Sequence, residues 1–294
     1  MLRIYSDRIT PIILKAYIIN YLNKQIDIVT LEMAIFYKNH VEILSNLLKP
    51  DYAAIINIGD AHLGTGGLNT IADICKNKVI IFQYAKHGYI NIDNQYLKKL
   101  SIKDNCLYYN NEKICNTRIK KLNYVSPLNS KIINNTIVIK RNVINVPILT
   151  NQSIVCILTS FAIGKDFNIA EKKISKAINN YTFVENRLQR VKIFGKNVIF
   201  DGDSSFKERL HQLSLNLYEK SYLVIRNYGN KDYKDDFVGI KKYFKKFNKV
   251  FLFKGIKYLN VLKKASNVVV VDNHDFMKGL DGEIFYHYND YFYI

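Results

Sequence analysis

The chain has 294 residues, a length that predicts two domains at about 100–200 residues per domain. Its 48% hydrophobic residues, with only 4 prolines and 13 glycines, exclude a disordered, collagen-like or low-complexity protein. Lys and Arg outnumber Asp and Glu by 43 to 25, and the net charge of +18 favours polyanionic partners such as phosphates, nucleic acid or an anionic membrane surface.

Short β-branched runs alternate with helix-period segments in the first ninety residues. Strands are predicted at 26–31, 53–58 and 79–82, and helices at 41–48 and 68–75. This alternation predicts a parallel sheet with helical crossovers, in which ligands gather at the carboxyl ends of the strands. From 89 to 146, alternating runs such as 106–109 and 136–139, separated by Asn-rich turns, predict small antiparallel strands appended to that sheet.

Helical periodicity returns at 153–163, stops at Gly164 and resumes at 170–178. A second alternating block follows, with strands predicted at 198–200, 222–225, 250–253 and 268–271 and helices at 206–217 and up to Phe247. We therefore expect an α/β fold in two domains, residues 1–185 and residues 186–294, with the boundary near Glu185.

The four cysteines, Cys75, Cys106, Cys115 and Cys156, show neither CxxC pairing nor a histidine at metal-ligand spacing. We expect reduced, mostly buried thiols and a cytoplasmic protein. The sequence has no signal-peptide pattern and no stretch near 18 uncharged apolar residues, so we expect neither secretion nor a membrane span.

One segment carries a specific motif. The run Asn57-Ile58-Gly59-Asp60-Ala61-His62-Leu63, followed by a glycine-containing loop and Lys76, resembles the Mur ligase family. It is most similar to the branch that adds D-alanyl-D-alanine in peptidoglycan synthesis, whose pattern is NIGxAHLxxxG with a lysine on the next helix. The resemblance implies a central domain with a parallel sheet and a C-terminal Rossmann-like domain, without the family's N-terminal UDP-substrate-binding domain, for which this chain has no room.

The resemblance also assigns roles to single residues. In an active member, the residues matching Glu32 and His62 help to hold Mg²⁺, and the lysine matching Lys76 becomes a carbamate that joins them as a catalytic and metal-binding group. On the nucleotide side it implies four residues: Arg187 in a Gly-Arg-like hinge, Asp201 at the start of a DDSYNxNP-like loop, Gln152 and Asn57. Each has a structural alternative, namely a vestigial metal trio, a salt-bridging hinge, a helix cap or a strand-to-loop turn.

The family's phosphate-binding GxxGKT loop is missing at its expected position. A gapless alignment places Tyr5 to Ile13 there, where Asp7 puts a carboxylate at an anion position and Pro11 has no N–H to donate. Isoleucines at positions 9 and 12 cannot readily adopt the positive φ that glycines allow. The adenine-side His-Asn signature and the KGS end are replaced as well, at 148–152 and 287–289, and we therefore expect no cofactor.

Three functions follow from these observations. The leading hypothesis is a pseudoenzyme or accessory subunit that binds a partner ligase or a peptide-like metabolite. The second is an active ATP-dependent amide ligase that works through an acyl phosphate and needs ATP and Mg²⁺. The third, nucleic-acid binding, rests on net charge and on the Lys-rich run 241–249; because its aromatic residues share one helical face, we expect a solvated surface helix there and no nucleic-acid partner. We assign no chemistry to the remaining histidines, His40, His87, His211, His274 and His287.

Overall fold

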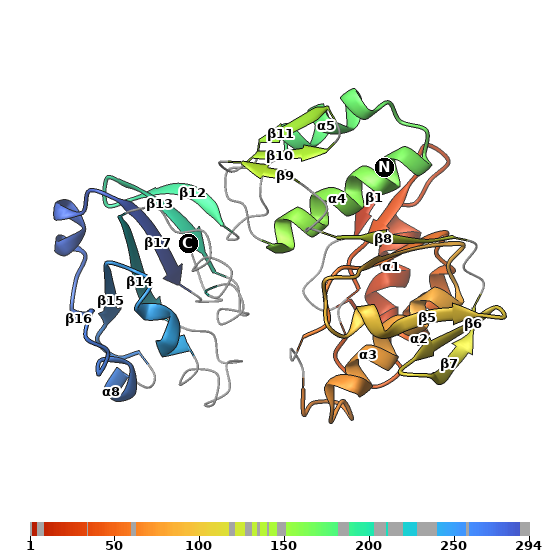
Figure 1. Cartoon of the computed structure of the whole chain (residues 1–294), viewed down its shortest axis with the longest axis horizontal. Helices are drawn as coiled ribbons and strands as arrows, with labels where there is room; N and C mark the ends of the chain where they lie inside the picture. Colours follow the sequence, from red (N-terminus) through yellow and green to blue (C-terminus); the bar gives the residue numbers. More distant parts are fainter. Residues whose placement is uncertain are drawn as a thin grey trace. The chain divides into compact units, whose positions relative to one another are not determined.

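The structure is a computed structural model that describes residues 2–4, 9–33, 35–59, 63–117, 121–126, 131–133, 136–139, 141–145, 151–181, 188–202, 210, 220–227, 240–256 and 259–288. Its contacts divide the chain into two compact units. Unit 1 comprises residues 1–132, 137–143 and 152–175, and unit 2 comprises residues 133–136, 144–151 and 176–294. Both are α/β (Figure 1). The predicted boundary near Glu185 falls outside the described residues and stays a prediction.

Unit 1 contains parallel sheets and helical crossovers, as the sequence predicts. The strands β1 (Leu2–Ile4) and β2 (Val29–Leu31) pair in parallel, and β3 (Tyr52–Ile55), β4 (His87–Asn91) and β8 (Lys121–Val125) form a second parallel sheet in the order β3-β4-β8. The helices are α1 (Pro11–Tyr21), α2 (His40–Leu48), α3 (Ile71–Val79) and α4 (Asn151–Asp166), with 3-10 turns η1 (Ile80–Gln83) and η2 (Leu97–Lys99). No helix in the described ranges combines the length and apolar character needed to cross a membrane.

The appended antiparallel strands are also present. They are β5 (Leu100–Lys103), β6 (Cys106–Tyr109) and β7 (Glu112–Asn116), which form one three-stranded sheet. A second small sheet, in the order β11-β10-β9, contains β9 (Lys131–Ile133), β10 (Thr136–Ile139) and β11 (Asn142–Asn145). This second sheet and helix α5 (Glu171–Asn179) are shared between the two units.

Two local predictions in unit 1 are wrong. Residues 79–82 are not a strand: α3 starts after a capping box between Thr70 and Asp73, later than predicted, and Val79 is its last residue, followed by η1. A short apolar run does not by itself distinguish a buried strand from a buried helical turn. Helix α4 also continues through Gly164, where a Cβ would lie 2.8 Å from Ile174 of α5, so this glycine permits close packing and does not end the helix.

Unit 2 is built on a six-stranded sheet in the order β12-β13-β17-β14-β15-β16. Its elements are β12 (Gln189–Ile193), β13 (Lys196–Asp201), β14 (Ser221–Asn227), β15 (Lys249–Phe253), α8 (Leu259–Leu262), β16 (Val268–Val271), the 3-10 turn η4 (Asp275–Gly279) and β17 (Glu283–Tyr288). The β12–β13 pair is antiparallel and the other pairs are parallel, as in a Rossmann-like domain. The four strands predicted for this block are confirmed; of the helix predicted at 206–217, only Leu210 lies in the described residues.

The Lys-rich run at 241–249 forms an amphipathic surface element. Residues 240–244 are helical and lead into a turn before β15. Phe244 is fully buried and Phe247 is 3% exposed, both in the core of the sheet, whereas the lysines at 242, 245 and 246 are exposed. The aromatic residues therefore pack inward, as predicted.

The four cysteines are free, but they are not mostly buried as expected. Cys75 is buried, Cys106 and Cys115 are half-buried, and Cys156 is exposed on α4. Burial raises the pKa of the Cys75 thiol to about 12, which keeps it protonated near neutral pH and unreactive.

Candidate functional site

The start of α1 is the segment that the sequence predicts in place of a phosphate loop, and from Ile9 onward the structure describes it. Thr10 is the N-cap, and its Oγ1 accepts a hydrogen bond from the backbone N–H of Ile13 at 3.3 Å. Pro11 is the first helical residue, where its fixed φ suits a helix and its missing N–H is tolerated. This end of the helix is therefore an ordinary capped N-terminus, in which the Ile13 N–H is already bonded to the capping side chain.

A buried histidine fixes the residue before that cap. Ile9 is 2% exposed, and its carbonyl oxygen accepts a hydrogen bond from His40 Nε2 at 3.0 Å. His40 is 1% exposed and stacks on Tyr37, with 4.4 Å between ring centroids. Since the carbonyl can only accept, Nε2 must carry the proton. The segment is thus held from inside by a side-chain anchor and by the burial of Ile9 against α1 and α2.

Acidification is expected to destabilise unit 1 through this histidine. Burial lowers the pKa of His40 below 6.5, so the unfolded chain takes up the proton more readily. The full stability is present above about pH 6.5 and is lost as pH falls through 6.5 toward the lowered pKa, at about 1.4 kcal/mol per pKa unit. Between about pH 7.5 and 5, urea denaturation should show a smaller loss in the free energy of unfolding for His40→Gln than for the unmodified chain. The glutamine amide can still donate to the Ile9 carbonyl but does not titrate. Equal pH slopes would assign the acid sensitivity to other groups.

The segment that carries the NIG motif is held by asparagine side chains. Asn94 Nδ2 donates to Asn57 Oδ1 at 2.8 Å and to the Ile58 carbonyl at 2.9 Å, and Asn91 Nδ2 donates to the Ile56 carbonyl at 3.1 Å. Lys78 Nζ lies 3.4 Å from the Asn57 carbonyl. Asn57 therefore connects the exit of β3 to the turn that follows β4, and His62, five residues further on, lies outside the described residues.

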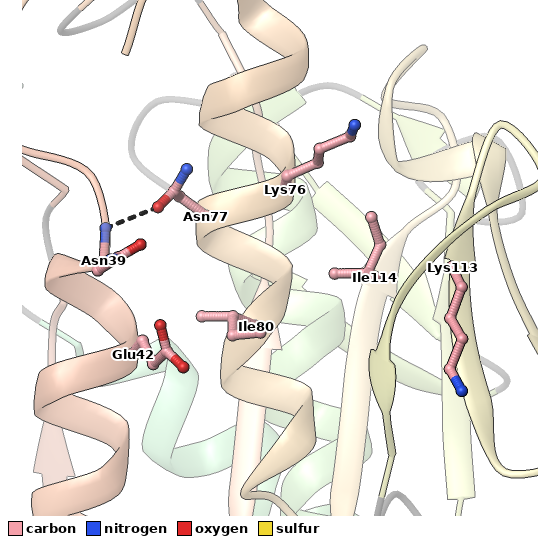
Figure 2. A pocket seen from close by; sticks show the side chains of 7 residues that line it. All are labelled: Asn39, Glu42, Lys76, Asn77, Ile80, Lys113 and Ile114. Atoms are coloured by element: carbon pink, nitrogen blue, oxygen red, sulfur yellow. Dashed lines mark hydrogen bonds between the residues drawn. The ribbon is translucent and has the colours of Figure 1, made fainter. Parts of the chain in front are cut away.

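Lys76 lies on α3 beside a shallow hollow of about 220 Å³ lined by Asn39, Glu42, Lys76, Asn77, Ile80, Lys113 and Ile114. Asn77 Oδ1 accepts the N–H of Asn39 at 2.7 Å, and Figure 2 shows the Lys76 side chain extending away from Glu42. The Lys76 amine donates to Glu112 on β7 at 2.5 Å. This hydrogen bond, together with the carboxylate charge, raises the pKa of Lys76, whereas a carbamate forms on the neutral amine.

Of the remaining predicted residues, Glu32 and Gln152 form no shared cluster in the described part of the chain. Glu32 is exposed just after β2, and Gln152 is the second residue of α4, half-buried. Arg187 lies outside the described residues. Within the described part of the chain, no group of three His, Cys, Asp or Glu side chains is placed to hold a metal ion.

In unit 2, Asp201 has a neighbour that the sequence did not reveal. Asp201 ends β13 and is 4% exposed; it is opposite His287 of β17, which is 2% exposed. Asp201 Oδ2 and His287 Nδ1 are 3.9 Å apart. The pair lies at the carboxyl end of two parallel strands, the edge where α/β sheets place ligands. No local motif marks His287, and only the strand register could have found it.

The comparison by family gives a direct match. The Mur ligase middle domain matches residues 7–164, which is more than half of the chain and contains α1, the NIG segment and α3. No curated protein sequence matches the chain.

Solved structures share the fold at low sequence identity. The MurF ligase of Thermotoga maritima in complex with ADP is 14% identical, with a TM-score of 0.75 over 97% of this chain and 69% of that one. MurF from Acinetobacter baumannii is 11% identical, with a TM-score of 0.69 over 91% of this chain and 62% of that one. A pseudomurein peptide ligase type C from Methanothermus fervidus is 14% identical, with a TM-score of 0.62 over 88% and 65%. The chain thus spans about two thirds or less of these relatives.

Proposed function

The chain belongs to the Mur ligase family, and from that premise we propose that it is a pseudoenzyme that binds a partner ligase as an accessory subunit, or a peptide-like metabolite. Each unit has its own hydrophobic core. A pseudoenzyme that binds a partner needs such a folded scaffold but does not need residues that bind ATP.

The observation that carries the proposal is the start of α1. A phosphate loop needs consecutive backbone N–H groups converging on the phosphates, a lysine that reaches them, and a hydroxyl for Mg²⁺. Here Ile9 is buried, its carbonyl is held by His40, Thr10 caps the helix with its own hydroxyl, and Pro11 has no N–H. These residues do not fit a triphosphate.

The metal-side residues that are described fit no better. Lys76 donates to Glu112, and this hydrogen bond raises the pKa of its amine, which favours the charged form over the neutral form that reacts with CO₂. Glu32 is exposed and follows β2, whose sheet with β1 is separate from the β3-β4-β8 sheet. We therefore derive no step through ATP or Mg²⁺.

Calorimetric titration with Mg²⁺-ATP tests the proposal. We expect no binding at concentrations that saturate the Thermotoga maritima ligase, which serves as the positive control because its structure holds ADP. Binding in the micromolar range would overturn the proposal. Phosphate release in the presence of amino-acid acceptors is the second readout, and we expect none; release that disappears in Lys76→Ala would establish the alternative, an active ATP-dependent amide ligase acting through an acyl phosphate.

A further inference from the structure

Half of the net charge of the chain comes from one short segment of unit 2. Between Phe237 and Val271 the sequence has nine lysines, no arginine and no acidic residue, so 35 residues contribute +9 of the total of +18. A general enrichment in lysine would not exclude every Asp and Glu from this stretch while 25 of them occur elsewhere in the chain. The segment includes the outer strands β15 and β16 of the sheet.

The fold gathers six of these lysines at the amino ends of the outer strands. Two turns carry them, one before β15 and one before β16, and Asn267 Nδ2 joins the turns by donating to the carbonyls of Phe244 at 2.7 Å and Phe247 at 2.8 Å. The Val250 N–H also donates to the Asn267 carbonyl at 3.0 Å. We call the six exposed lysines near these turns the lysine edge: Lys242, Lys245, Lys246, Lys249, Lys263 and Lys264.

The charge of the lysine edge is not neutralised within the described part of the chain. None of the six lysines forms an ion pair there, whereas Lys254, at the other end of β15, is bound by Asp272 at 2.7 Å. Because β15 and β16 are parallel to β17, the lysine edge lies at the amino ends of the strands, and Asp201 and His287 lie at the carboxyl ends of theirs. The lysine edge is therefore separate from the candidate site of this unit.

We propose that the lysine edge binds the anionic surface of a lipid membrane. Clusters of four to eight basic residues bind anionic headgroups with about 1 kcal/mol per lysine near the surface. Lysine, a hydrated point charge on a flexible stem, suits a diffuse layer of headgroups and needs no fixed geometry. The same segment exposes two valines, Val261 on α8 at 38% and Val269 on β16 at 39%.

The same observations argue against nucleic acid as the partner. Single-strand binding uses exposed aromatic rings for base stacking, and base recognition uses arginine forks. In this segment Phe244 and Phe247 are buried and arginine does not occur. An alternative role for these lysines is to protect the edge strand β16, which consists of four valines, from edge-to-edge aggregation. This alternative predicts no binding to lipid.

Co-sedimentation of the full chain with vesicles tests the proposal. We expect binding to vesicles of phosphatidylcholine and phosphatidylglycerol at roughly 3:1, none to phosphatidylcholine alone, and a steep loss of binding between about 50 and 300 mM salt. Replacing Lys245, Lys246, Lys263 and Lys264 with Gln should reduce binding at least about tenfold.

The matched control removes the same charge from unit 1, at the exposed lysines 98, 103, 172 and 173, and should leave binding within about twofold. Circular dichroism melting curves verify that both variants are folded, and the salt titration of the unmodified chain provides a measurement that needs no variant. Equal loss in the two variants, binding to neutral vesicles, or no binding at all would overturn the proposal. So would tight, lysine-edge-dependent binding to duplex DNA or single-stranded RNA without binding to vesicles.

Discussion

Replacing Gly66 with alanine is expected to destabilise unit 1 by at least about 3 kcal/mol. Gly66 has φ of 53°, in the left-handed region, and a Cβ at this position would lie 2.4 Å from the Phe36 carbonyl oxygen and 2.6 Å from Tyr37 Cα. Both neighbours are backbone, so no side-chain rotation relieves the overlap. Moving the loop would also break the hydrogen bond from the Lys38 N–H to the Gly66 carbonyl, which is 2.8 Å long.

Gly64 offers the matched control for this substitution. It lies in the same loop with φ of 79°, but nothing lies within 4 Å of the Cβ that alanine would add. Gly64→Ala should therefore cost only the conformational penalty of about 1–2 kcal/mol. Urea denaturation of both variants, followed by circular dichroism, measures the difference. If the two variants unfold at the same denaturant concentration, the close approach of the loop to residues 36–37 does not contribute to stability.

This loop illustrates what a motif predicts and what it leaves open. The NIG run and the following glycines mark a strand-to-loop turn, and β3 does end at Ile55, just before Asn57. The reason for Gly66 in particular lies in a segment thirty residues earlier, at Phe36 and Tyr37, so local sequence gives no signal for it. Long-range backbone contacts of this kind are fixed by tertiary packing.

Helix boundaries show the same division between local and distant causes. Pro11 at the first position of α1 is a readable start signal, and the capping box between Thr70 and Asp73 is written in the sequence as well. The continuation of α4 through Gly164 cannot be read from the local sequence, because it depends on Ile174 of α5, which fills the space beside the glycine. Local chemistry therefore predicts where these helices start better than where they end.

The candidate site was predictable to different degrees in its two parts. The prediction that the segment before α1 lacks a phosphate loop rests on residue types alone, since proline cannot donate and isoleucine avoids positive φ. The anchor that holds Ile9 comes from His40, which is 31 residues away and matches no motif. Likewise Asp201 is marked by its motif, but His287 becomes its neighbour only through the register of β13 and β17.

A buried tyrosine joins α4 to the β3-β4-β8 sheet. Tyr89 of β4 is 1% exposed, and its hydroxyl donates to Asp166 Oδ2 at 2.5 Å; Asn123 Nδ2 of β8 donates to the same oxygen at 3.2 Å. Asp166 is the last residue of α4, where a negative charge is unfavourable for the helix dipole. These two donors compensate that cost. Burial, together with the hydrogen bond and charge of Asp166, raises the pKa of Tyr89, so the phenol stays protonated and can donate.

Tyr89→Phe should therefore destabilise unit 1 by about 1.5–3 kcal/mol, because it removes a hydrogen bond to a charged acceptor and keeps the ring. Hydrogen-exchange mass spectrometry of peptides from α4 and β4 measures the loss where it occurs, and urea denaturation measures its size. The control is Tyr124→Phe on β8, a ring that is 62% exposed, which should change stability by no more than about 0.5 kcal/mol. Unchanged exchange in α4 for Tyr89→Phe would mean that the helix is held to the sheet by its apolar contacts and not by this hydrogen bond.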